Sequence, residues 1–205
     1  MYDNLLTQNT KLKKTSILNK RLVLNFGIPA YKSNTGKVTC PFADECIKYC
    51  YARKGTFRYP NAVNAYEKRL RIARSPEFET IMDAALLIKN PHFVRIHDSG
   101  DYFSKKYMDR WFNIMRKHPN IKFYSYTNSV LLMKQYDGEM PQNFDIIFST
   151  DGKQREHVDK SKDRHAVIFN TEEELESAGY VNASDNDLLA TRWYSDNIKV
   201  GLIKH

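Results

Sequence analysis

The segment FVRIHDSGD, residues 93–101, is the stretch from which the fold is predicted. Its first five residues favour a short buried strand, and the last four are turn-forming, so a strand is expected to end in a loop here. An amphipathic helix is expected over 105–117, and from residue 93 onward predicted strands alternate with predicted helices. Such alternation is typical of parallel strands joined by right-handed crossovers.

The elements predicted on either side of this segment extend the pattern. Strands are expected at 21–27, 93–97, 121–127, 144–149, 165–170 and 198–203, and helices at 60–73, 77–88, 105–117, 130–136 and from 171. Five or six parallel strands indicate an α/β protein with a partial, open parallel β/α barrel, and a doubly wound open sheet is the alternative. In such folds the strands carry functional groups at their C-terminal ends, where Asp101, Thr127, Thr150 and Asn170 are expected.

The length and composition indicate one folded domain. The chain has 205 residues, and 41% of them are hydrophobic, which is enough for a core. Residues 1–20 are rich in lysine and are predicted to be a basic N-terminal arm. Residues 21–205 are predicted to be a single α/β domain with a cysteine loop at 40–55.

The charge of the chain favours an anionic partner. The formal net charge is +8, which suits RNA or another polyanion, and a lysine-rich solvated surface is the alternative reading. No apolar run approaches the ~20 residues of a membrane span, and residues 1–20 lack the apolar core of a signal peptide. A cytoplasmic protein without membrane contact is therefore expected.

The cysteine loop, CPFADECIKYCYARKG at residues 40–55, contains every cysteine of the chain. Cys40, Cys46 and Cys50 are separated by five and then three residues, and an odd number of clustered thiols argues against disulfides. Three thiolates can hold a four-iron cluster by three of its irons and leave the fourth open. A zinc site needs a further ligand, such as His97. Reduced cysteines packed in a core are the remaining alternative.

The loop after the predicted strand at 93–97 has two interpretations. Ser99 and Gly100 permit close approach of a ligand to the backbone, and Asp101 offers a carboxylate to an amine. His97 and Asp98 could act as acid and base. The alternative is a strand-to-helix turn with a capping side chain and a structural histidine.

Basic and aromatic residues alternate after the cysteine loop, in a pattern that suits RNA or single-stranded DNA. A solvated helix face over packed aromatics is the alternative. The candidate nucleic-acid contacts are Arg53, Lys54, Arg58, Lys68 and Arg71.

Two resemblances follow from these motifs. The cysteine loop resembles the cluster-binding loop of the radical S-adenosylmethionine superfamily, in which an aromatic residue commonly precedes the last cysteine, as Tyr49 precedes Cys50 here; the usual spacing there is three then two residues. The chain resembles more closely a phage-encoded family of unassigned function, the gene product 88 family. That resemblance covers residues 20–205 and rests on CPFA from Cys40, CYARKG from Cys50 and the stretch 95–127.

These resemblances imply a phage-encoded iron–sulfur protein of unknown substrate in the cytoplasm of an infected bacterial host. They imply a [4Fe–4S] cluster on Cys40, Cys46 and Cys50, and S-adenosylmethionine with its amino group near Ser99, Gly100 and Asp101. The alternative is a non-catalytic phage effector on the same scaffold that binds RNA or a host protein, for example as a host-defence inhibitor. A structural zinc site in a nucleic-acid binder is a third reading, and whether the chain is an enzyme stays open.

Overall fold

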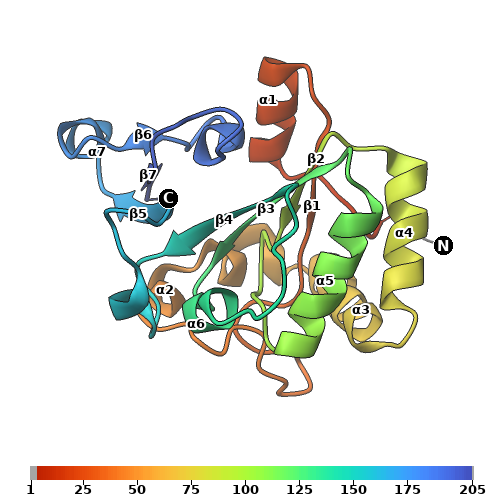
Figure 1. Ribbon diagram of the computed structural model, residues 1–205. Helices are drawn as coiled ribbons and strands as arrows, with labels where there is room; N and C mark the ends of the chain where they lie inside the picture. Colours follow the sequence, from red (N-terminus) through yellow and green to blue (C-terminus); the bar gives the residue numbers. More distant parts are fainter. Residues whose placement is uncertain (1–3, 205) are drawn as a thin grey trace.

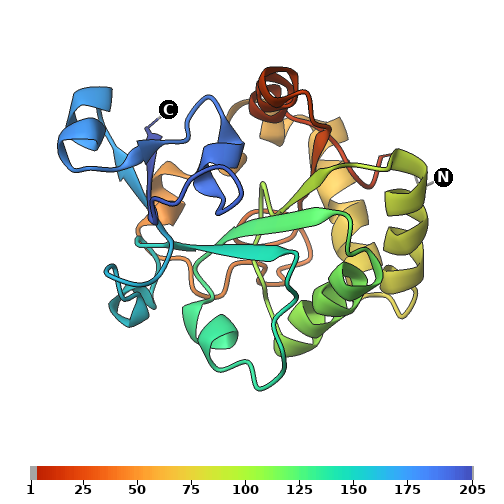
Figure 2. The ribbon, with the colours of Figure 1, turned by 45° about the horizontal axis from the view of Figure 1, so that its top comes forward.

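The chain forms an α/β half-barrel, which the computed structural model describes over residues 4–204. Seven strands form one sheet in the order β1-β2-β3-β4-β5-β7-β6, and every neighbouring pair is parallel. The sheet curls without closing, as Figures 1 and 2 show. The strands are β1 Val23–Phe26, β2 Phe93–Ile96, β3 Lys122–Thr127, β4 Phe144–Ser149, β5 His165–Phe169, β6 Val181–Asn182 and β7 Lys199–Ile203.

The strand order confirms the open parallel sheet and argues against the doubly wound alternative. From β1 to β5 the order in space is the order in the chain, whereas a doubly wound sheet reverses direction near its middle. The sheet has one strand more than the five or six expected, because the two-residue β6 is too short to leave a pattern in the sequence. All four residues of β1 are buried, since both faces of the sheet are covered there.

Helices and single turns connect the strands. The helices are α1 Thr10–Asn19, α2 Cys46–Tyr49, α3 Pro60–Arg74, α4 Phe78–Lys89, α5 Lys105–Lys117, α6 Val130–Lys134 and α7 Glu172–Ser177. The 3-10 turns are η1 Tyr51–Arg53, η2 Gly55–Arg58, η3 Arg155–His157 and η4 Asp187–Ala190. No helix among residues 4–204 is long and apolar enough to cross a membrane.

The outer face of the sheet carries the larger core. Helices α3, α4 and α5 lie together on this side (Figure 1). The Ser104 side chain caps α5 by accepting from the Tyr107 backbone, and apolar residues at helical spacing then turn one face of α5 inward. Trp111 from that face packs edge-on against Phe26 and Phe78, with ring centroids 5.2 Å away in each case. This packing holds α5 and α4 together against β1.

The inner face is covered by α1 and η4, which contact each other. Leu12 of α1 is fully buried with Val23, Phe93 and Leu188 in a second, smaller core. The sequence predicted a basic N-terminal arm over 1–20, of which residues 1–3 lie outside the described part of the chain. In the remainder, α1 packs on β1 and covers the inner face. A single buried leucine among lysines gave too little periodicity to show that this helix belongs to the domain.

Candidate functional site

The C-terminal ends of the strands form a rim that brings together part of the predicted site. Asp101 and Thr127 meet there, since Thr127 Oγ1 donates to Asp101 Oδ1 over 2.6 Å. Thr150 instead donates to the Ala166 carbonyl, and Asn170 is exposed after β5. The rim site is therefore formed by β2, β3 and the loops beside them.

The Asp101 carboxylate ties three segments of the rim together. Besides Thr127, it accepts from the backbone N–H groups of Tyr102 at 2.7 Å and Asn128 at 2.9 Å. Its own N–H donates to the carbonyl of Thr39, next to the first cysteine. Burial raises the pKa of Asp101 to about 6. The carboxylate is therefore held in a fixed place beside the cysteine loop.

The backbone before Asp101 makes close contacts that require glycine. Gly100 has φ +84°, and a Cβ at this position would lie 2.2 Å from Ile28 Cγ1. The Ser99 carbonyl accepts from the Ile28 N–H at 2.9 Å. Ser99 and Gly100 thus join the end of β2 to the segment that follows β1. Contact of Ser99 and Gly100 with the amino group of a cofactor stays a prediction.

His97 and Asp98 make their contacts with different helices. His97, at φ +67°, shares a 2.9 Å hydrogen bond with the Tyr107 hydroxyl of α5, and burial lowers its pKa to about 3, so it is neutral. Asp98 Oδ2 accepts from the Tyr66 hydroxyl of α3 at 3.0 Å, and burial raises the pKa of this carboxyl. The predicted roles of His97 and Asp98 as acid and base stay a prediction.

The three cysteines lie in one loop over the rim. Cys40 Sγ accepts from the Tyr31 N–H at 3.2 Å, and Cys46 Sγ accepts from Asn128 Nδ2 at 3.8 Å. Burial raises the pKa of all three thiols, that of Cys46 to about 11, and the charges of the neighbouring sulfurs add to the effect for Cys40 and Cys46. Without a compensating cation the thiols, including that of Cys50, are therefore protonated at neutral pH.

The three cysteines do not form a preassembled site for one metal ion in the described residues. In the part of the chain that the structure describes, no three His, Cys, Asp or Glu side chains are placed to hold one metal ion. Three thiolates around one zinc, at about 2.3 Å each, would have to touch one another. In a four-iron cluster each cysteine binds a different iron and the sulfurs stay further apart. Cluster binding by Cys40, Cys46 and Cys50 stays a prediction.

Neither histidine near the loop in sequence completes a zinc site. His92 precedes β2, at the opposite end of the strand from the rim, and its Nδ1 accepts from the Leu22 N–H. His97 faces Tyr107. The zinc reading therefore gains no fourth ligand from either residue.

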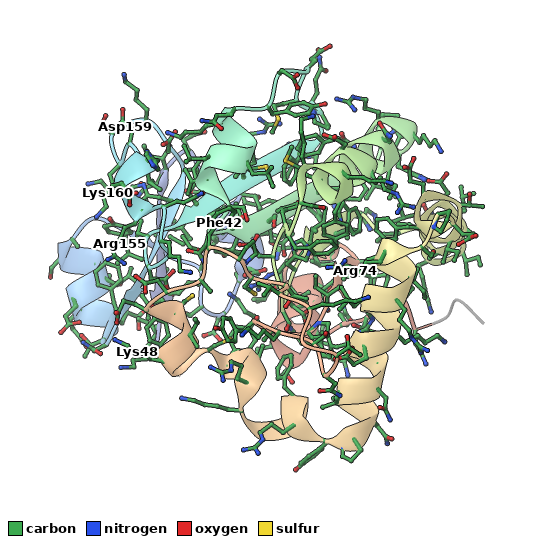
Figure 3. All side chains as sticks on the ribbon, turned by 90° about the horizontal axis from the view of Figure 1, so that it is seen from below. Phe42, Lys48, Arg74, Arg155, Asp159 and Lys160 are labelled. Carbon is green, nitrogen blue, oxygen red and sulfur yellow. The ribbon has the colours of Figure 1, made fainter. Side chains whose placement is uncertain are left out.

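The loop is also tied to the connection after β4, which sequence reasoning missed. The Tyr49 hydroxyl donates to Asp151 Oδ2, and the Lys153 N–H donates to the Phe42 carbonyl at 2.8 Å. Arg155 forms an ion pair with Asp44 at 2.9 Å. Figure 3, seen from below, shows Phe42, Lys48 and Arg155 on this side of the molecule. The aspartate in the turn Asp151-Gly152 was the available signal, but nothing in the sequence linked it to Tyr49.

A second polar group lies beneath the rim, on the inner face of the sheet. Asp187 of η4 is fully buried and accepts from Lys11 at 2.6 Å, Arg95 at 3.2 Å and the Tyr124 hydroxyl at 2.7 Å. The Tyr126 hydroxyl also donates to Asp187, at 3.3 Å, so Tyr124 and Tyr126 lie on the same face of β3. Burial alone would raise the pKa of Asp187, but Arg95 and Lys11 lower it. Lys11 and Asp187 are too far apart in sequence to have been paired.

The predicted nucleic-acid residues all lie at the surface. Arg53 follows the last cysteine, donates to the Ile47 carbonyl at 3.1 Å and lies 5.6 Å from the Tyr31 ring centroid. All five residues predicted to contact RNA are exposed: Arg53, Lys54, Arg58, Lys68 and Arg71. Their exposure is compatible with binding and equally with a solvated surface.

The fold and the rim define an α/β half-barrel protein that carries three thiols over the C-terminal ends of its parallel strands. A family model described as Gene product 88 matches residues 4–205, and the chain belongs to this family. The predicted resemblance to the gene product 88 family is therefore confirmed.

Curated relatives are similar over part of their length. The Gene 88 protein of Mycobacterium phage L5 is 29% identical over 126 residues, which are 55% of this chain and 52% of that protein. The Gene 88 protein of Mycobacterium phage D29 is 27% identical over the same shares of both chains. The match thus spans about half the length of these phage proteins. No solved structure gives a significant match, so similarity to radical S-adenosylmethionine enzymes is not shown.

Proposed function

We propose that this chain binds a [4Fe–4S] cluster through Cys40, Cys46 and Cys50 and acts as an iron–sulfur protein of the radical S-adenosylmethionine type. The observation that carries the proposal is the position of the three thiols, in one loop over the C-terminal ends of parallel strands. Functional groups of β/α barrels lie at these ends.

The surroundings of the loop support a bound cofactor. Each thiol would release its proton to solvent on binding iron, because the thiolate is the ligand, and burial raises the pKa of all three thiols in the metal-free chain. The N–H groups that face Cys40 and Cys46 stabilise charge on sulfur. The cluster with S-adenosylmethionine would supply radical chemistry. Asp101, with Ser99 and Gly100 beside it, is proposed to orient the amino group of that cofactor near the open iron.

The loop itself is suited to change on cofactor binding. The residues of α2, η1 and η2 are half-buried or exposed, and none is fully buried. A segment with few buried contacts rearranges at low cost. We therefore expect the sulfurs to adjust to the cluster while Asp101, which is fixed by three hydrogen bonds, stays in place.

Anaerobic reconstitution with iron and sulfide tests the proposal. The wild-type chain should bind about four irons and absorb in the visible range, and single Cys→Ala variants of Cys40, Cys46 and Cys50 should lose most of that iron. Lys48→Ala, in the same loop but exposed and paired only with Glu45, is the matched control and should keep its iron. Equal iron in the wild-type chain and a triple Cys→Ala variant would refute cluster binding.

Cofactor binding needs a separate measurement. S-adenosylmethionine should bind the reconstituted chain, and Asp101→Asn should weaken that binding. If the affinity is the same in Asp101→Asn, the assignment of the Ser-Gly-Asp segment is wrong, whatever the iron content.

The second candidate is a non-catalytic effector that binds RNA or a host protein. Exposed basic residues after the cysteine loop favour RNA, as does the net charge of +8. The triple variant Arg53→Ala, Lys54→Ala, Arg58→Ala should weaken RNA retention on filters and reduce its salt dependence. The exposed lysines of α1, Lys13 and Lys14, provide the control. Equal retention by both variants would contradict an RNA site here; binding to a host protein stays a prediction.

A further inference from the structure

A pocket of about 400 Å³ lies at the N-terminal ends of β3 and β4, at the opposite end of these strands from the cysteine loop. It is bounded by the end of α5, the start of β3, the segment 141–143 before β4, and Trp193, which follows η4. The volume is within the roughly 300–1,000 Å³ of small-molecule sites. None of the rim residues lines this pocket, so it is a separate place for a ligand.

One wall of the pocket is held in place by Asn143. Its Nδ2 donates to the carbonyls of Met115, His118 and Ile121 at 3.0, 3.0 and 2.8 Å. These bonds join the end of α5 and the loop after it to the start of β4. Because the amide group is planar, its Oδ1 lies on the side away from these carbonyls and remains an acceptor.

Two cations line the pocket without a carboxylate partner. Lys122 is half-buried, and its Nζ lies 5.2 Å from the ring centroid of Trp193 and 5.6 Å from that of Phe93. Arg116 donates to a hydroxyl and a backbone carbonyl. Neither residue forms an ion pair within residues 4–204. A cation held against aromatic rings keeps its charge available to an anion.

The carboxylates near the pocket do not neutralise these cations. No acidic residue lines the pocket. Asp83 forms an ion pair with Lys117 at 3.0 Å, and Asp145 forms one with Arg164 at 3.6 Å. Glu139, two residues before the lining segment 141–143, is exposed and offsets at most one of the two lining cations. The pocket is therefore positively charged.

An aromatic ring and three amides provide the other contacts. Trp193 is half-buried, and its ring packs edge-on against Phe93, with centroids 5.9 Å apart. The side-chain amides of Asn120, Gln142 and Asn143 offer both donors and acceptors. Nucleic-acid bases stack on aromatic side chains and present both donors and acceptors at their edges. A positive pocket with this lining therefore suits a ligand that carries a base as well as a phosphate.

We propose that this pocket binds a nucleotide, with the phosphate at Lys122 and Arg116 and the base at Trp193 and the amides. The proposal does not rest on the proposed iron–sulfur function, since the pocket is remote from the cysteine loop. A free mononucleotide and the 5′-phosphorylated end of an RNA strand carry the same groups, and the net charge of +8 favours both.

Equilibrium dialysis of the metal-free full-length chain against adenosine monophosphate tests the proposal. This nucleotide should bind saturably, and adenosine and ribose 5-phosphate, which each lack one part of it, should bind about tenfold more weakly. Lys122→Gln removes the charge and should raise the dissociation constant about tenfold. Lys199→Gln is the matched control, because Lys199 begins β7 as Lys122 begins β3 and lies 5.9 Å from the Tyr180 ring centroid, outside the pocket. It should keep the wild-type constant.

Gln142→Glu provides a second variant of nearly the same shape. Gln142 is exposed, and its backbone carbonyl rather than its side chain accepts from Arg192, so the fold should be kept. A carboxylate in the pocket should repel the phosphate and weaken nucleotide binding several-fold. Where Lys122→Gln does not fold, as judged by circular dichroism, this variant decides.

The outcomes are distinct. The proposal is overturned if adenosine monophosphate does not bind, if adenosine or ribose 5-phosphate binds as tightly, or if the folded pocket variants keep the wild-type constant. A 5′-phosphorylated RNA oligonucleotide that competes with the nucleotide would assign the pocket to strand ends, and one that does not compete would assign it to free nucleotides. The iron content of the cysteine variants tests the rim alone, so the two proposals fail separately.

Discussion

The substitution Asp187→Asn should be one of the most destabilising single changes in this chain. Asp187 is fully buried, and its two oxygens accept from Lys11, Arg95 and two tyrosine hydroxyls. Asparagine has one acceptor oxygen, and its NH₂ group would face donors, so two cations lose their counter-charge. Breaking a buried ion pair typically costs 3–5 kcal/mol, which is a large part of the roughly 5–15 kcal/mol that stabilises a domain.

Asp185→Asn is the matched control for this prediction. Asp185 is two residues earlier, 84% exposed at its side chain and 3.4 Å from Lys14. Such a surface pair contributes roughly 0–1 kcal/mol. Urea unfolding followed by circular dichroism measures both free energies, and equal m-values would show that the same surface is exposed. A difference between the variants below about 1 kcal/mol would refute the view that Asp187 is the counter-charge of the inner face.

The pH dependence of Asp187 follows from its lowered pKa. Its folded-state pKa lies below that of an unfolded aspartate, about 4, so its contribution is present above that pH. The contribution is lost as the pH falls through the folded-state value. Asp187→Asn should remove this part of the acid sensitivity.

Three further results are expected. Burial raises the pKa of Asp101 to about 6, so this carboxyl adds stability below pH 4 that is lost as pH rises through 6, about 3 kcal/mol in all; Asp101→Asn should flatten that part of the curve. Gly100→Ala should cost more than Gly36→Ala, because both glycines have positive φ but only the first faces Ile28. Iodoacetamide should alkylate Cys46 at pH 8 about 100-fold more slowly in native metal-free protein than in urea, since burial raises its pKa to about 11.

The outer layer of the fold was predictable because its signals are local. The α5 helix carries Tyr107, Trp111 and Met115 on one face behind a capping serine, and the structure ends it at Lys117 as expected. The strand predicted at 144–149 has the same bounds in the structure. These elements depend on spacing within about ten residues, which a single sequence displays.

The inner layer could not be predicted, because its contacts join residues that are far apart in the sequence. Its central contact joins Lys11 to Asp187, and no local pattern distinguishes those residues from solvated charges. The same holds for Tyr49, whose partner Asp151 lies beyond β2, β3 and β4. The cysteines could be grouped because they share one loop, whereas their neighbours come from separate strands.

The two polar groups of the site differ in how firmly they are held. Arg95 lies between β1 and β3 in a sheet covered on both faces, so its position is fixed before any ligand binds. The cysteine loop has no buried residue in its turns and depends on contacts such as that of Tyr51 with Asp98. The sheet therefore keeps its position when the loop rearranges, which is the behaviour expected if the loop adjusts to the proposed cluster.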